Sequence, residues 1–260
     1  MRGWLRTGCV SALAIVALTG LAHAQSVDEI VARNLQARGG VEKLKGMTSA
    51  KITGDVDQRG MKIHITTWAK RPNYMRREMD ATPPPPSPGR ASIPGTTGPI
   101  KAVVASDGAH VWMINPMMGG GAQEITGPQA DMAKADADFD SPLLDYKAKG
   151  TTIQLVGTEP IQGKPAYHLK LTKKTGLVQH YYLDVETALE VRTASDVEQD
   201  GNKAAMTTDF SNYQTIDGLT MPFVMKQALN GTPVAEITIS KWEINIPVDD
   251  DLFKMPGKTP

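Results

Sequence analysis

Alternation of apolar and polar residues is the dominant pattern of the chain. In the run 61–70, apolar side chains at most odd positions alternate with polar ones at most even positions, so one face is apolar and the other is wet. Similar runs at 51–57 and 73–80 flank it, separated from it by turn sequences at 58–60 and 71–72. The pattern predicts half-buried strands of an antiparallel sheet.

The rest of the chain continues this pattern. Short strands are expected at 102–106 and 110–115, joined by Asp107-Gly108, a residue pair that suits hairpin twist. From Thr151 onward, consecutive strands are separated by turn sequences at Gly163-Lys164, Asp184 to Thr187, Asp200-Gly201, Asp217-Gly218 and Asn230-Gly231. One extended, curved antiparallel sheet with helices packed on its apolar face accounts for these runs.

Helical periodicity is expected in two segments. Over 26–47, apolar residues fall three or four positions apart, Gly39-Gly40 predicts a stop, and a second short helix can follow from Val41 to Leu44. Over 128–146, one or two short helices are expected, interrupted near 140–142. The expected fold class is therefore mainly β, or α+β.

The first 24 residues are typical of a cleaved secretory signal peptide. Two arginines precede an apolar run from Val10 to Leu21, which ends in Ala22-His23-Ala24. A membrane anchor is the competing interpretation, but the run is shorter than the roughly 20 residues that cross a bilayer. We expect cleavage after Ala24 and export, leaving residues 25–260 as a single domain without a cysteine, because Cys9 is the only one.

Charge and proline content refine this expectation. Removal of Arg2 and Arg6 takes the 28 basic side chains to 26, against 28 acidic ones, so nothing resembles the basic surface that nucleic acid requires. The segment 81–99 contains seven prolines. We interpret it as a long surface loop, with a ligand for a proline-binding domain as the alternative.

Methionine is frequent in the expected sheet and helices. The chain has 13 methionines and only four phenylalanines. Thioether side chains adapt to irregular apolar partners, so a cavity lined by them could hold an acyl chain. An ordinary core explains the same composition, and composition alone leaves both interpretations open.

Two segments resemble the LolA-type family of periplasmic lipoprotein carriers. The first is the run from Trp68 to Arg76, with the sequence WAKRPNYMR, and the second is the run from Val104 to Pro116, with an S-D-G, a tryptophan and an N-P. Their order and separation also match, apart from the proline-rich insertion between them. The resemblance implies an incomplete β-barrel closed by a lid of short helices, which opens to accept acyl chains.

The resemblance also implies roles for particular residues. Arg71 matches the arginine that in such carriers hydrogen-bonds lid backbone and holds the empty cavity shut, although a role confined to the corner beside Pro72 is equally open. Met75 stands at an apolar cavity position, and Trp112 and Met113 stand on the matching hairpin. The residues expected to line an apolar cavity are Ile63, Ile65, Met75, Met79, Trp112, Met113, Met132 and Leu143.

Catalytic and metal sites are not indicated. The histidines at 64, 110, 168 and 180 lie on separate strands without metal-ligand spacing, although His168 and His180 could face each other across a hairpin. No nucleophile elbow or phosphate-binding glycine loop is present, and Ser106-Asp107 is explained by its turn. We therefore expect no enzyme activity, no metal and no cofactor.

The function expected from the resemblance is that of a periplasmic carrier. It would bind acylated cargo, a lipoprotein or a lipid, and move it from the inner to the outer membrane. Its partners would be an inner-membrane release complex and an outer-membrane acceptor, without nucleic acid, and the protein would be a monomer. The alternative is a regulatory module that senses lipid or lipoprotein and acts on an inner-membrane partner.

Overall fold

The structure is a computed structural model that describes residues 26–82, 100–127, 130, 133–134, 137–199 and 202–257. The predicted signal peptide and Met132 lie outside the described residues. Residues 83–99 of the predicted proline-rich loop also lie outside the described residues. The first two residues of that loop, Ala81 and Thr82, belong to a strand instead. There they pair with Ile63 and Lys62, because the strand pairing continues further than the proline content indicated.

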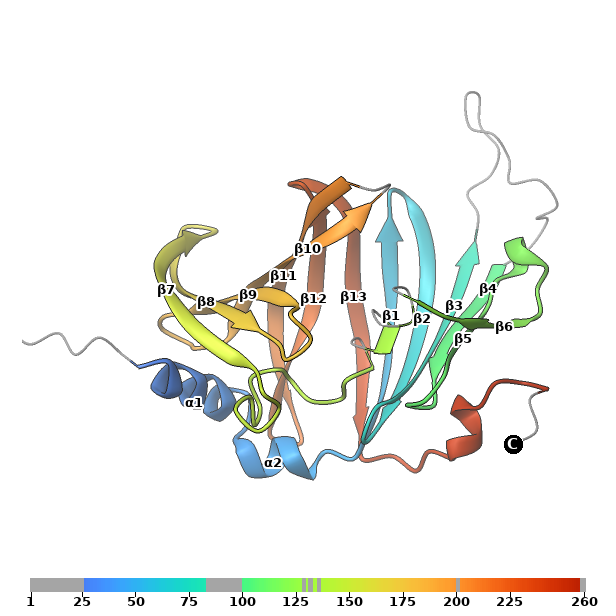
Figure 1. The fold of residues 1–260 in the computed structure, drawn as a ribbon, viewed down its shortest axis with the longest axis horizontal. Coiled ribbons are helices and arrows are strands. Elements are labelled where there is room, and N and C mark those ends of the chain that lie inside the picture. Colours follow the sequence, from blue (N-terminus) through green and yellow to red (C-terminus); the bar gives the residue numbers. More distant parts are fainter. Residues whose placement is uncertain are drawn as a thin grey trace, which may run out of the picture.

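Thirteen strands of the described residues form one antiparallel sheet, in the order β6-β5-β4-β3-β2-β1-β13-β12-β11-β10-β9-β8-β7. Figure 1 shows that this sheet is strongly curved, with β6 and β7 at its two separate edges. The predicted mainly β fold, a curved sheet that does not close into a barrel, is confirmed. The strands are β1 (Ser49–Gln58), β2 (Met61–Lys70), β3 (Tyr74–Thr82), β4 (Ile100–Ser106), β5 (Val111–Ile114), β6 (Ala122–Ile125), β7 (Thr152–Ile161), β8 (Lys164–Thr172), β9 (Val178–Asp184), β10 (Glu190–Gln199), β11 (Asn202–Ile216), β12 (Leu219–Leu229) and β13 (Thr232–Ile244).

The helix α1 (Val27–Ala37) begins at a capping box formed by Ser26 and Glu29. The Ser26 hydroxyl accepts from the Glu29 backbone N–H, and the Glu29 carboxylate accepts from the Ser26 N–H. The helix ends before Gly39, whose φ of +122° is left-handed, and a Cβ at this position would lie 2.4 Å from the Gly218 carbonyl oxygen. Only glycine therefore allows this close approach of α1 to the turn between β11 and β12.

The helix α2 (Val41–Gly46) follows directly, and the apolar residues of both helices pack on the concave face of the sheet. Figure 1 shows α1 beside β7 to β9 and α2 further toward the middle of the sheet. Their apolar residues join leucines of β8, β9 and β12 in the main hydrophobic core. Its buried members are Ile30, Val31, Leu35, Leu44, Leu143, Leu144, Leu169, Leu171, Leu183, Leu219 and Met221. Burial of these side chains contributes about 1.5–3 kcal/mol each and fixes the helices on the sheet.

A second, smaller core lies on the convex face at the opposite end of the sheet. Val103, Ala105 and Trp112 pack there, and the Trp112 indole N–H donates to the Phe253 carbonyl at 2.8 Å. Phe253 belongs to the 3-10 helix η2 (Asp250–Phe253), so the C-terminal segment covers this part of the convex face. Another 3-10 helix, η1 (Pro116–Met118), precedes β6 and exposes two methionines.

The segment 140–150 differs from its prediction. The predicted interruption near 140–142 is present, but the helix expected to continue up to residue 146 is replaced by a series of turns. Pro142 has no N–H to donate, the Ser141 hydroxyl accepts the N–H of Leu143, and Asp145 has a φ of +52°. These features end helical geometry while leaving Leu143 and Leu144 buried in the core. The described helices include none with the length and apolar character required to span a bilayer.

Candidate apolar cavity and its polar latch

The middle of the concave face forms an open hollow of about 830 Å³. Its wall runs from β3 through β2, β1, β13, β12 and β11 to β9 and β10, and Arg38 at the end of α1 borders it. Directly paired strand residues share a face, and the row Phe210, Met225, Ile237, Val56 and Ile63 crosses five strands in this way. The apolar lining comprises Ile52, Val56, Ile63, Ile65, Met79, Phe210, Pro222, Met225, Ala235, Ile237 and Ile239.

A smaller pocket of about 240 Å³ adjoins the hollow beneath the helices. Its floor comes from β1 to β3, including Ala50, Ala69 and Met75, and its roof comes from Leu44 and the segment 137–144. The structure therefore places a covered compartment next to an open one on the same face of the sheet.

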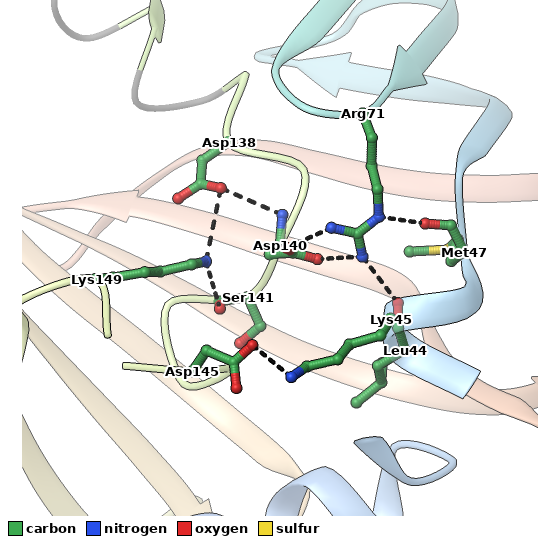
Figure 2. Close-up of polar contacts among 9 residues, drawn as sticks. All are labelled: Leu44, Lys45, Met47, Arg71, Asp138, Asp140, Ser141, Asp145 and Lys149. Carbon is green, nitrogen blue, oxygen red and sulfur yellow. Dashed lines mark hydrogen bonds and ion pairs between the residues drawn. The ribbon is translucent and has the colours of Figure 1, made fainter. Parts of the chain in front are cut away.

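Arg71 connects the two parts of this roof (Figure 2). Its Nε donates to the Met47 carbonyl at 2.7 Å and its Nη2 to the Leu44 carbonyl at 3.0 Å, at the C-terminal end of α2. The same guanidinium forms a bidentate ion pair with Asp140, with N···O distances of 2.6 and 2.7 Å. One side chain thus joins the corner between β2 and β3 to α2 and to the 137–144 segment.

Further polar contacts hold this segment in place. Lys149 Nζ lies 3.7 Å from an Asp138 carboxylate oxygen and donates to the Ser141 carbonyl at 3.4 Å, while Lys45 pairs with Asp145 at 2.7 Å. Figure 2 shows these contacts around Asp140. The roof is therefore held by polar contacts at its edge as well as by its buried leucines.

A cluster of largely buried polar side chains lies at the boundary between core and hollow. Arg38 Nη1 donates to the Glu190 carboxylate at 3.0 Å, and the Tyr213 hydroxyl donates to the Glu190 carbonyl at 2.8 Å. Burial lowers the pKa of Arg38, but the Glu190 carboxylate and the Tyr213 and Tyr181 phenols together outweigh it, so the pKa is raised. Burial, followed by the nearby Glu190 carboxylate, raises the pKa of Tyr181 and Tyr213 far above the usual value.

The residues proposed to line a cavity from sequence fall into several places. Ile63, Ile65 and Met79 line the hollow, and Met75 lines the smaller pocket. Leu143 is 0% exposed and belongs to the main core rather than to either wall. Met132 lies outside the described residues.

The two neighbouring hairpin residues, Trp112 and Met113, face opposite sides of the sheet. Met113 pairs with Val104, which pairs with Arg77, so it lies on the concave face but lines neither space. Trp112 lies on the convex face against η2, because it pairs through Ala105 with Arg76. Alternation places neighbouring residues on opposite faces but does not reveal which face is concave.

Sequence reasoning missed several lining residues, among them Arg77, Trp242 and Phe210. Trp242 belongs to a visibly alternating run and could have been assigned to one face. Arg77 stands between Met75 and Met79 on the same face of β3, and its charge would ordinarily indicate the solvent-exposed side.

The convex face carries polar rows instead. His168 and His180 do face each other, with Nε2 and Nδ1 2.7 Å apart, and His168 Nδ1 lies 2.6 Å from the Glu159 carboxylate. Burial, followed by the neighbouring His168, lowers the pKa of His180. Within the described residues, no group of three or more histidine, cysteine, aspartate or glutamate side chains is arranged to hold a metal ion.

The fold, an open and curved antiparallel sheet with short helices on its concave face, is similar to that of three solved structures. A DUF1329 family protein from Desulfovibrio piger shares it with a TM-score of 0.56, 15% identity and coverage of 88% of this chain and 97% of the other. A putative outer membrane lipoprotein-sorting protein domain from Vibrio parahaemolyticus matches with a TM-score of 0.55, 12% identity and coverage of 86% and 94%. A LolA superfamily protein from Nitrosomonas europaea matches with a TM-score of 0.52, 14% identity and coverage of 89% and 98%.

These likenesses confirm, at the level of the fold, the resemblance seen in the sequence. No family model matches the chain, and no curated protein matches it in sequence.

Proposed function

We propose that this protein binds the acyl chain of a lipid or lipoprotein in the hollow and carries it between the inner and outer membranes. The observation that carries the proposal is an apolar concave face that the chain's own helices leave uncovered, with a volume of about 830 Å³. Ligand sites are concave, mostly apolar and roughly 300–1,000 Å³ in volume. The fold shared with a lipoprotein-sorting domain supports the same proposal.

The energetics of acyl binding fit an apolar hollow without covalent chemistry. Each methylene removed from water contributes about 0.8 kcal/mol, so roughly ten contribute about 8 kcal/mol before the cost of immobilising the ligand. Affinity should therefore rise with chain length until the hollow is filled. A methionine- and isoleucine-lined wall can adjust to chains of different shape.

Native mass spectrometry of the protein purified from its own periplasm, followed by lipid extraction, tests the proposal. We expect a co-purifying acyl lipid or acylated lipoprotein, and its loss from a variant in which Ile65→Trp fills the hollow. Circular dichroism checks that this variant is folded. Recovery of the same lipid with both proteins would contradict binding in the hollow.

The proposed route requires export, for which residues 1–24 are the predicted signal, and it requires a release complex and an acceptor at the two membranes. Pull-down from periplasm and solubilised membranes tests these partners. Acylated lipoproteins as the main co-purified species support the carrier, whereas a single inner-membrane regulator would support lipid sensing instead.

We also propose that Arg71 is a latch that stabilises the closed roof of the smaller pocket. Its two bonds to Asp140 break if the 137–144 segment moves away from α2, whereas its bonds to the Leu44 and Met47 carbonyls hold the guanidinium in place at the end of α2. Hydrogen bonds to charged groups contribute about 1.5–3 kcal/mol each, which is enough to shift a closed-to-open equilibrium by tenfold or more.

Arg71→Leu should therefore accelerate exchange of bound acyl probe by about tenfold while the fold survives, measured by stopped-flow displacement of a fluorescent fatty acid. The matched control is Arg192→Leu, which removes another bidentate pair, with Asp209 at 2.5 and 2.8 Å, on the convex face. Equal exchange rates in Arg71→Leu and the wild type would remove the latch from the mechanism.

A further inference from the structure

The hollow and the smaller pocket share one boundary with an unusual composition. Five of its residues carry polar side-chain atoms, in a surface that is otherwise mostly aliphatic. The residues that line both spaces are Arg38, Ile52, Thr67, Arg77, Ser141 and Trp242. Four of them form one cross-strand row, because Trp242 pairs with Ile52, Ile52 with Thr67, and Thr67 with Arg77.

Arg77 is the charged member of this row without an acidic partner. Its Nε donates to the Thr67 hydroxyl at 3.2 Å, and no ion pair joins it to a described carboxylate. Other arginines nearby are neutralised: Arg38 pairs with Glu190, Arg71 with Asp140, and Arg76 with Glu78. A guanidinium is charged at all ordinary pH values, so the lining of the hollow contains a cation that no described carboxylate neutralises.

Two further donors at this boundary lack acceptors. The indole N–H of Trp242 and the Nε of Arg38 are buried from solvent without a hydrogen-bond partner. A buried donor without an acceptor costs about 1–3 kcal/mol, and such groups occur where a ligand supplies the missing acceptor. Both donors belong to residues that line the same two spaces as Arg77.

We propose that this boundary is a headgroup site and that the cargo is an acyl lipid with an anionic, oxygen-bearing head, a carboxylate or a phosphate. The inference rests on the proposed acyl-binding function and specifies the chemistry of its ligand. Arg77 pairs with the anion, and the Trp242 indole N–H donates to a second oxygen of the same lipid, while the acyl chain lies along the aliphatic wall.

Water exclusion makes this site selective. When an acyl chain fills the hollow, it displaces the water that solvates Arg77, and a neutral head would then leave the cation without a partner. An anionic head replaces that water with a charge-assisted, bidentate hydrogen-bonded pair. The hollow therefore discriminates against acyl alcohols and monoacylglycerols of the same chain length.

Fluorescence titration at pH 8 tests the proposal with cis-parinaric acid and with its alcohol, which has the same chain. We expect the wild-type protein to bind the acid at least tenfold more tightly than the alcohol. In Arg77→Gln this preference should fall to about twofold, because the acid loses its counter-charge and the alcohol no longer leaves a desolvated cation without a partner. Competition with a lysophosphatidic acid and with a fatty acid of equal chain length distinguishes a phosphate head from a carboxylate.

Controls separate the headgroup site from the carrier function. Lys62→Gln removes a cation from the convex face and should leave the tenfold preference intact. Trp242→Phe keeps an aromatic ring but loses the donor and should weaken binding of the acid about threefold. Equal affinity of the wild type for acid and alcohol would overturn the headgroup proposal while leaving acyl binding in place, and failure to bind either probe would overturn both.

Discussion

Two regions of the concave face are built from the same kind of alternating strand, but helices cover one region and leave the other open. At the β7 to β9 end, α1 covers the face and leucines such as Leu169 and Leu183 are 0% exposed. Around the hollow, residues of β2 and β3 such as Ile63 and Met79 remain partly exposed, whereas α2 covers only the adjoining residues of these strands, such as Met75. Coverage by helices, rather than strand pattern, therefore decides which end is core and which end is cavity.

The composition of the two ends follows this division. Leucine dominates the covered end, where a fixed shape must be filled at high density. Isoleucine, methionine and a few polar groups line the uncovered end. The covered end supplies the stability that allows the other end to keep an unfilled apolar surface.

The largest expected effect is on the free energy of unfolding, when truncation of a side chain in the covered core is compared with truncation of one that lines the hollow. Leu169→Ala removes a fully buried side chain from the covered end and should lower the free energy of unfolding by about 2–5 kcal/mol, measured by urea denaturation. Ile63→Ala at the hollow should cost about 1 kcal/mol or less, because the side chain is partly solvated and leaves no closed cavity. Comparable losses in the two variants would show that the hollow is a packed core in solution.

A smaller, pH-dependent effect should mark the boundary between the two ends. The pKa of Tyr181 is raised by burial, so the folded state holds the phenol proton more tightly than the unfolded state. This contribution is fully present below the unfolded pKa of about 10 and is lost as the pH rises above it. When the pH is raised from 9 to 11, the free energy of unfolding should fall by about 1 kcal/mol less in Tyr181→Phe than in the wild type, measured by urea denaturation. Identical pH profiles would contradict burial of this phenol.

The smallest effect is expected on the convex face. Lys226 and Glu236 pair at 3.5 Å with both side chains largely exposed. Lys226→Gln should change the free energy of unfolding by about 0.2–1 kcal/mol, and the change should diminish in 1 M salt because exposed charges are screened. A loss above 2 kcal/mol would show that this face is not solvent-exposed in solution.

Local patterns in the sequence predicted much of the fold. The N-terminal helix, the strand runs and the Asp107-Gly108 hairpin follow from periodicity and turn chemistry, and each is confirmed. In the segment 140–150, local chemistry predicted the interruption near 140–142 but not the turns that follow it, in which Asp145 has a left-handed φ and which are anchored by distant contacts such as the pair between Asp140 and Arg71.

The candidate site was predicted less completely. The aliphatic members at 63, 65 and 79 could be assigned from alternation, since an apolar strand face must be buried against something. Trp112 was assigned to the wrong face, because nothing local indicates that the C-terminal segment covers the convex side. Arg77 was missed because a charged side chain on a strand is ordinarily assigned to the solvent-exposed face, whereas Arg77 lines the hollow.

Site-selective fluorescence quenching tests the central claim, that the hollow on the concave face receives an acyl chain. Trp242 lines the hollow, whereas Trp68 and Trp112 lie on the convex face, in the row that pairs with Lys51 and Arg76. A brominated fatty acid should quench part of the tryptophan emission of the protein lacking residues 1–24, and Trp242→Phe should abolish that quenching while the emission of the other two remains unquenched. Quenching that persists in Trp242→Phe, or its absence from the wild type, would contradict the account.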